Sequence, residues 1–231
     1  LPKADGIYHL SYGMVELPTG KMKSREGTVV DADDLVTDMV QIAETHTTEL
    51  GKTEGFSTEE LAALYNTIAL GALKFYLLRV DPKKKMIFNP EESIDIHGYT
   101  GPFIQYTYAR IRSILRKEDR FGGNAEQAAD ILHTVTPHFD TALLPLEKEL
   151  LLHLEQYPTA IAQAATENNP SLVANYVYQL AKTFNSFYAE HSISRAESEE
   201  KKELRLRIAV MTANVIKSGM ALLGIAVPEK M

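Results

Sequence analysis

The sequence predicts a mainly α-helical protein in which a helical bundle follows a small head of short strands and loops. From residue 31 onward, helix-start signals and one-sided apolar stripes recur, as is typical of helices packed in a bundle. Residues 1–30 lack a helical period and are interrupted by Pro18, Gly20 and Gly27, which favours short strands and loops. No internal repeat is evident.

Two helices are predicted before residue 81. The first spans residues 31–51, with acidic residues in its first turn, where the helix dipole favours them, and a glycine at its end. The second begins at Ser57, whose spacing to Glu60 matches a capping box, and runs to about Val80.

The window 61–78 is apolar enough to resemble a membrane span. Asn66, Thr67 and Lys74 interrupt it, so we interpret it as a buried helix of a soluble protein. Residues 81–95 contain two prolines and a short apolar patch, which indicates a connector with room for one short strand.

Further helices are expected at 103–117, 126–136, 145–166 with an interruption near Pro158, 170–189 and 196–223. Three of them carry an apolar stripe: Ile104, Tyr108, Ile111 and Leu115; Leu172, Tyr176, Leu180, Phe184 and Phe187; and Leu204, Ile208, Met211, Val215 and Leu222. Pro170 suits a first helical turn, and Gly224 suits a C-terminal cap.

Composition sets further bounds. The 231 residues carry a net charge of −7 and no cysteine, which excludes a disulfide framework and a thiolate metal site and fits a reducing compartment. The chain starts at Leu1 without the pattern of a signal peptide, so we interpret it as a piece of a longer protein. The acidic balance argues weakly against nucleic-acid binding, so the position of the basic residues becomes the test.

The loop GKMKSREGTVV at 20–30 is basic in an acidic chain. A phosphate-binding P-loop is excluded, because the glycine spacing is wrong and Met22 stands where a hydroxyl residue is needed after Lys21. Two interpretations stay open: a solvated turn, or a mobile loop in which Lys21, Lys23 and Arg25 meet the phosphates of a nucleotide. The seven histidines form no zinc pattern, and we predict no metal site.

The predicted helix 103–117 carries basic residues opposite its apolar stripe, with one aromatic residue among them: Gln105, Arg110, Arg112, Arg116, Lys117 and Tyr106. Arginines beside an aromatic ring suit RNA, whereas a solvated helix with arginines lying over the core explains the same pattern. On the predicted helix 170–189, Asn185 and Tyr188 share a face beside the core stripe, where Tyr188 either stacks on a base or closes the bundle.

In order along the chain, three stretches resemble arginyl-tRNA synthetases, a family of class I aminoacyl-tRNA synthetases. HLSYGMVELPTGKMKSREGTVVDADDL is similar to the region of the KMSKS signature, GYTGPFIQYTYARIRSIL to the family's GNTGPYxQYAHARxxSI stretch, and LLGIAVPEKM to its usual ending. The resemblance implies a remnant of a Rossmann-type catalytic domain at 1–30, a helical stem-contact region at 31–97 and an α-helical anticodon-binding domain at 98–231.

By the same resemblance, the KMSKS-like loop contacts the ATP phosphates. Lys21 and Met22 match the first two signature positions, whereas Lys23, Ser24 and Arg25 depart from the pattern. The resemblance implies tRNA contacts at Tyr106, Arg110, Asn185, Tyr188 and Met231.

The implied parent enzyme is a cytoplasmic monomer that joins arginine to tRNA(Arg) with ATP and Mg²⁺, and that has no membrane or DNA partner. The HIGH signature is absent here, so we expect this fragment to bind no cofactor and to be inactive in arginine activation. An alternative is a stand-alone helical module that binds RNA or protein and has no enzymatic parent.

Overall fold

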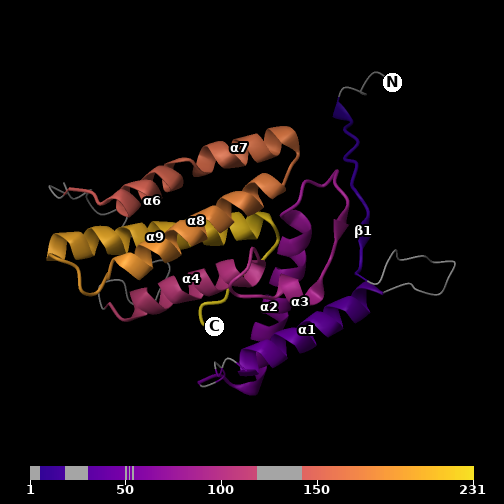
Figure 1. The fold of residues 1–231 in the computed structure, drawn as a ribbon, viewed down its shortest axis with the longest axis horizontal. Coiled ribbons are helices and arrows are strands. Elements are labelled where there is room, and N and C mark those ends of the chain that lie inside the picture. The colour runs from indigo at the N-terminus through magenta and orange to yellow at the C-terminus, as the bar shows by residue number, and fades with distance from the viewer. Residues whose placement is uncertain (1–5, 19–30, 50, 52, 54, 119–141) are drawn as a thin grey trace.

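The computed structural model describes residues 6–18, 31–49, 51, 53, 55–118 and 142–231. Figure 1 shows two groups of helices in this part of the chain: α1, α2 and α3 at one end, and α4 with α6 to α9 lying roughly alongside one another as a bundle. The mainly helical prediction is therefore confirmed. The helix expected at 126–136 lies outside the described residues.

The first group holds α1 (Ala32–Glu49), α2 (Thr58–Leu78) and α3 (Pro90–Ser93). Ser57 forms the expected capping box: its backbone N donates to Glu60 Oε2 at 2.8 Å, and its Oγ accepts from the Glu60 backbone N at 3.2 Å. Gly51, after α1, has a φ of 64°, a conformation that glycine adopts without strain. A first hydrophobic cluster lies between α1 and α2 and includes Met39 and Ile68.

A two-stranded sheet flanks this group. β1 (Val15–Glu16) pairs in parallel with β2 (Met86–Ile87), so the strand expected within 81–95 is present. Gly13 approaches the chain before β2 closely, since its backbone N donates to the Pro82 carbonyl at 2.6 Å.

Within the described residues, α2 is long and apolar enough to cross a membrane. Of its apolar window, 44% is buried inside the protein, where α2 packs against α1 and α4. Packing against two helices accounts for the apolar residues in the buried part of the window.

The bundle consists of α4 (Gly101–Arg116), α6 (Pro145–Glu155), α7 (Tyr157–Glu167), α8 (Ser171–Glu190) and α9 (Glu199–Leu222). The interruption predicted near Pro158 is the break between α6 and α7. The four stripe residues of α4 are at most 2% exposed and join the larger hydrophobic cluster, which fills the bundle. Gly224, with a φ of 68°, ends α9 as expected.

The predicted stripe on α9 is wrong at two positions. Met211 and Leu222 are 36% and 60% exposed, whereas the polar Arg205 and Thr212 are buried. The helix is central to the bundle and packs against α4, α6 and α8, so its buried surface is too broad for a single stripe.

Helices α2 and α4 touch through their backbones. A Cβ atom on Gly101 would lie 2.3 Å from the Gly71 carbonyl oxygen, so side chains are excluded at this crossing. Gln105, beside it, donates from Nε2 to the carbonyls of Thr67 on α2 at 2.9 Å and of Ala226 after α9 at 2.8 Å. The two groups of helices thus meet at a close contact.

A charged cluster is buried between α6 and α9. Glu147 is fully buried and accepts bonds from Lys201 Nζ at 2.6 Å and Arg205 Nε at 2.9 Å. Burial opposes ionisation of Glu147, but these bonds outweigh it, and the pKa of Glu147 is lowered. The cluster fixes α6 against α9.

Candidate nucleic-acid interface

A pocket of about 300 Å³ lies where α4, the end of α8 and the C-terminal residues meet. We call it the basic pocket. Its lining contains four cationic residues and no acidic residue, and it consists of Tyr106, Ala109, Arg110, Ser113, Ile114, Arg116, Lys117, Tyr188, Ser194, Lys230 and Met231. Four of the five residues that the sequence assigned to RNA binding therefore line one cavity, and the fifth, Asn185, contacts it through Arg110.

Arg110 is held in place by its neighbours. Its Nη1 donates to Asn185 Oδ1 at 2.5 Å, and Asn185 Nδ2 donates in turn to Thr107 Oγ1 at 2.7 Å. The guanidinium carbon lies 4.8 Å from the ring centroid of Tyr106 and 6.0 Å from that of Tyr188. A guanidinium fixed in this way offers its remaining donors to a ligand at a reduced entropic cost.

Tyr188 presents an aromatic surface at the pocket. It is 37% exposed, and its ring is nearly parallel to that of the buried Phe184, with an interplanar angle of 6° and centroids 6.3 Å apart. Phe184 and Phe187 are fully buried, as their place in the stripe predicted. The core thus fixes the α8 residues that flank the exposed ring.

The C-terminal residues 225–231 run along α4 and are bonded to it. Tyr108 Oη donates to Glu229 Oε1 at 2.8 Å and Arg112 Nε to Oε2 at 2.6 Å, while Arg116 Nη1 donates to the Glu229 backbone carbonyl at 2.9 Å. With the bond from Gln105 to Ala226, four side chains of α4 hold this segment, which we call the tail.

The tail corrects the predicted basic face of α4. Gln105 and Arg112 were assigned to it, but they are 0% and 6% exposed. Arg112 is buried beside the tail, where Glu229 accepts its bond, and Gln105 is buried between the tail and α2, donating to Ala226 and Thr67. The cations that line the pocket are Arg110, Arg116, Lys117 and Lys230.

Met231 lies at a junction between the two groups of helices. It lines the basic pocket, and it also packs on the first hydrophobic cluster beside Ile68, Ile94 and Tyr106. The position of Met231 therefore depends on both groups.

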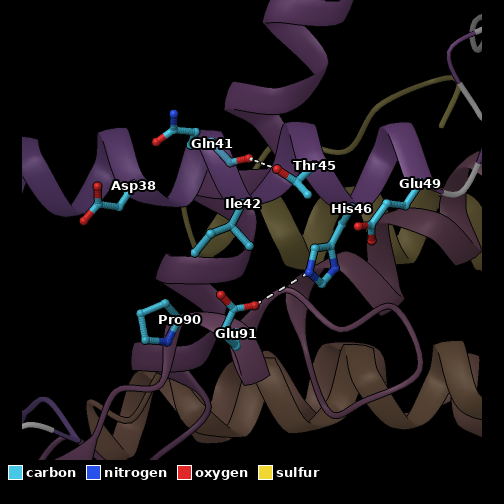
Figure 2. A pocket seen from close by; sticks show the side chains of 8 residues that line it. All are labelled: Asp38, Gln41, Ile42, Thr45, His46, Glu49, Pro90 and Glu91. Carbon is cyan, nitrogen blue, oxygen red and sulfur yellow. Dashed lines mark hydrogen bonds and ion pairs between the residues drawn. The ribbon is translucent and has the colours of Figure 1, made fainter.

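A second hollow, of about 480 Å³, lies between α1 and α3 and has the opposite charge. Figure 2 shows Asp38, His46 and Glu49 of α1 around it, with Glu91 of α3 facing His46 at 3.7 Å. Three carboxylates repel a phosphate backbone, so this face is unsuited to RNA. Neither in this hollow nor in the other described segments is a group of three or more His, Cys, Asp or Glu side chains placed to hold a metal ion.

Sequence reasoning missed three polar pocket residues, Ser113, Ser194 and Lys230, and Glu229, which anchors the tail. Ser113 lies on the same helix face as Tyr106, Arg110 and Lys117. These four positions are spaced by 4, 3 and 4 residues, and this helical spacing could have identified Ser113. Ser194, Lys230 and Glu229 are brought in by tertiary contacts, and no local pattern indicates them. The loop residues Lys21, Met22, Lys23, Ser24 and Arg25 lie outside the described residues, so their ATP contacts stay a prediction.

Comparison with known proteins gives a consistent family. Residues 104–231 match the DALR anticodon binding domain. The chain is 55% identical over 228 residues to the arginine–tRNA ligase of Flavobacterium psychrophilum, covering 99% of this chain and 36% of that protein. It is 49% identical over 230 residues to that of Amoebophilus asiaticus, covering 100% and 37%. The chain thus spans about a third of the length of the curated relatives it matches.

Solved structures of arginyl-tRNA synthetases share the fold of this chain. The arginyl-tRNA synthetase of Thermus thermophilus superposes with a TM-score of 0.81 at 28% identity, covering 99% of this chain and 36% of that one. That of Plasmodium falciparum, at 23% identity, shares the fold with a TM-score of 0.77, covering 96% and 35%. The matched DALR segment covers more than half of the chain and contains the basic pocket. The chain therefore belongs to the DALR anticodon-binding domain family, in the form carried by the C-terminal part of arginyl-tRNA synthetases.

Proposed function

We propose that this chain reads the anticodon of tRNA(Arg), and that the basic pocket receives an unstacked anticodon nucleotide. The observation that carries the proposal is the convergence of Tyr106, Arg110, Tyr188 and Met231 on one cavity without acidic residues. Single-stranded loops of RNA are recognised by aromatic stacking and by cations on the phosphates, and the pocket offers both.

Six of the pocket residues then have a role. Tyr188 stacks on the base, since its ring is exposed and its neighbours on α8 are fixed by the core. Arg110 meets a phosphate or a base edge, in an orientation set by Asn185. Lys117 and Lys230 add positive charge around the cavity, and Ser113 and Ser194 supply hydroxyl groups.

The wider assignments rest on the relatives, which are named as arginine–tRNA ligases. We propose that the longer protein joins arginine to tRNA(Arg) with ATP and Mg²⁺ as a cytoplasmic monomer, and that Lys21 to Arg25 contact the ATP phosphates. The boundaries 1–30, 31–97 and 98–231 belong to the same proposal. Within 31–97, the acidic hollow between α1 and α3 is unsuited to contact RNA.

The direct test is binding at low salt to a tRNA(Arg) transcript and to one with a changed central anticodon base. We expect tighter binding to the cognate transcript, and equal affinity for both would contradict base reading. Tyr188→Ala should cost about 1–3 kcal/mol of binding free energy, while Tyr188→Phe should bind like the parent chain.

One control and one further pocket variant complete the test. Tyr12→Ala removes a ring that is 85% exposed and does not line the basic pocket, and it should leave binding unchanged. Arg110→Ala should weaken binding and reduce the slope of log K against log salt by about 0.7, the value for one single-strand phosphate contact. An interaction module without base reading would show the same loss for both transcripts.

A further inference from the structure

The tail places residues at the basic pocket that the helices alone do not supply. Lys230 and Met231 line the cavity, yet neither belongs to a helix. Their position therefore depends on whatever holds the tail against α4, and the bonds to Glu229 and Ala226 are the contacts that do so.

Glu229 is the centre of this attachment. One carboxylate oxygen accepts from Tyr108 and the other from Arg112, while its backbone carbonyl accepts from Arg116. Partial burial opposes ionisation of Glu229, but the bonds from Arg112 and Tyr108 outweigh it, so the pKa of Glu229 is lowered and the carboxylate is charged at neutral pH. Burial and the bond to Glu229 raise the pKa of Tyr108, which keeps its proton as the donor.

We propose that Glu229 is a positioning residue for RNA reading: it anchors the tail on α4 so that Lys230 and Met231 form a wall of the basic pocket. The inference rests on the proposed function of that pocket. Glu229 does not line the cavity itself, and it acts through the two residues that follow it. Arg112, buried against Glu229, serves as the tail's anchor point and not as a phosphate ligand.

The sign of the effect separates this role from simple electrostatics. A carboxylate next to an RNA site repels phosphate, so removing its charge should strengthen binding if Glu229 did nothing else. If Glu229 positions the wall, Glu229→Gln should weaken binding, because one amide oxygen cannot replace two charged acceptors. We expect about fivefold weaker binding of the cognate transcript, the scale of a partly exposed charge-assisted bond.

A matched control is available on α8. Glu190 is exposed, and Glu190→Gln changes the net charge of the chain by the same amount as Glu229→Gln. We expect Glu190→Gln to leave RNA binding unchanged or slightly stronger. If Glu229→Gln behaves in the same way, Glu229 acts only through its charge and the proposal is wrong.

A double-mutant cycle tests whether Glu229 acts through the wall. In a chain that already carries Lys230→Ala and Met231→Ala, the wall is missing, so Glu229→Gln should add less than a twofold further loss. If the fivefold loss persists in that background, Glu229 has another role and the proposal is overturned.

The position of the tail can also be followed without RNA, through the NMR signal of the Met231 methyl group. The chain has seven methionines, and Met231→Leu assigns the signal. Glu229→Gln should shift and narrow the Met231 signal, because the side chain leaves its packing on the first hydrophobic cluster, while the unfolding midpoint in urea stays near that of the parent chain.

The possible outcomes are distinct. Weaker RNA binding together with a shifted Met231 signal supports the proposal. An unmoved Met231 signal overturns it, and so does a shifted signal with unchanged RNA binding. If the parent chain fails to discriminate between the two transcripts, the proposed function fails, and the Met231 signal still decides whether Glu229 holds the tail.

Discussion

Replacing the buried Glu147 with glutamine should destabilise the bundle by about 3 kcal/mol. The carboxylate is fully buried and lies 2.6 Å from Lys201 Nζ and 2.9 Å from Arg205 Nε. Glutamine has nearly the same shape but no charge, so Lys201 loses its carboxylate partner and Arg205 loses one of its two. Removing one partner of a buried pair costs about 3–5 kcal/mol.

The lower end of that range applies because both cations keep other acceptors. Lys201 also donates to the Ala142 carbonyl at 2.6 Å, and Arg205 also bonds to the Ser192 carbonyl and to Glu197. In the variant Lys201 keeps a hydrogen-bond acceptor and Arg205 keeps a carboxylate partner, which limits the loss.

Urea unfolding followed by circular dichroism measures the change, with Glu203→Gln as control. Glu203 pairs with Arg207 across one helical turn at 2.8 Å, closer to the surface of α9. A pair of this kind contributes about 0.5 kcal/mol. If the two variants have the same unfolding midpoint, the argument that the buried cluster fixes α6 on α9 is refuted.

The same cluster predicts a pH dependence. The pKa of Glu147 is lowered below the ordinary value of 4.5, so its contribution to stability is present above that value and is lost as the pH falls through the lowered pKa. Glu147→Gln should therefore flatten the acid limb of the stability curve. An unchanged acid limb would show that other carboxylates determine it.

Three further predictions concern packing and protonation. Gly101→Ala should lower the unfolding free energy by more than about 2 kcal/mol, because the new Cβ would lie 2.3 Å from a backbone oxygen of Gly71. As a control in the same urea titration, Gly6→Ala should leave the unfolding free energy unchanged, because the space around its new Cβ is open. Gly224→Ala should cost about 1 kcal/mol, since the position has a φ of 68°, and the urea midpoint reports this loss. Burial lowers the pKa of His153, so its neutral form stabilises the fold above the ordinary value of 6.5 and stability declines as the pH falls below it. His153→Phe should remove that slope between about pH 7.5 and pH 5.5, and an unchanged slope would contradict the assignment.

Local signals in the sequence predicted most helices correctly. The capping box at Ser57 and the 4, 3, 4 spacing from Ile104 to Leu115 depend only on neighbouring residues, and both are present in the structure. Such features are visible in a sequence because the interacting groups lie within a few positions of one another.

Contacts between distant residues account for what the sequence did not reveal. Arg112 and Glu229 are 117 positions apart, so the periodicity of α4 alone predicted a solvated or RNA-binding arginine. The stripe on α9 was wrong at Met211 for the same reason, because neighbouring helices, not the sequence of α9, decide which sides are covered. The pocket residues were found mainly through family resemblance, whereas Lys230 needed the position of the tail.

The glycine contact between α2 and α4 joins the two groups of helices through their backbones. No side chain separates the backbones at Gly71 and Gly101, so a larger residue at Gly101 would force α2 and α4 apart. Helix α4 also holds the tail, whose last residue packs on the first hydrophobic cluster. A substitution that widens the crossing should therefore also displace Met231 from the basic pocket, since Met231 contacts both groups of helices.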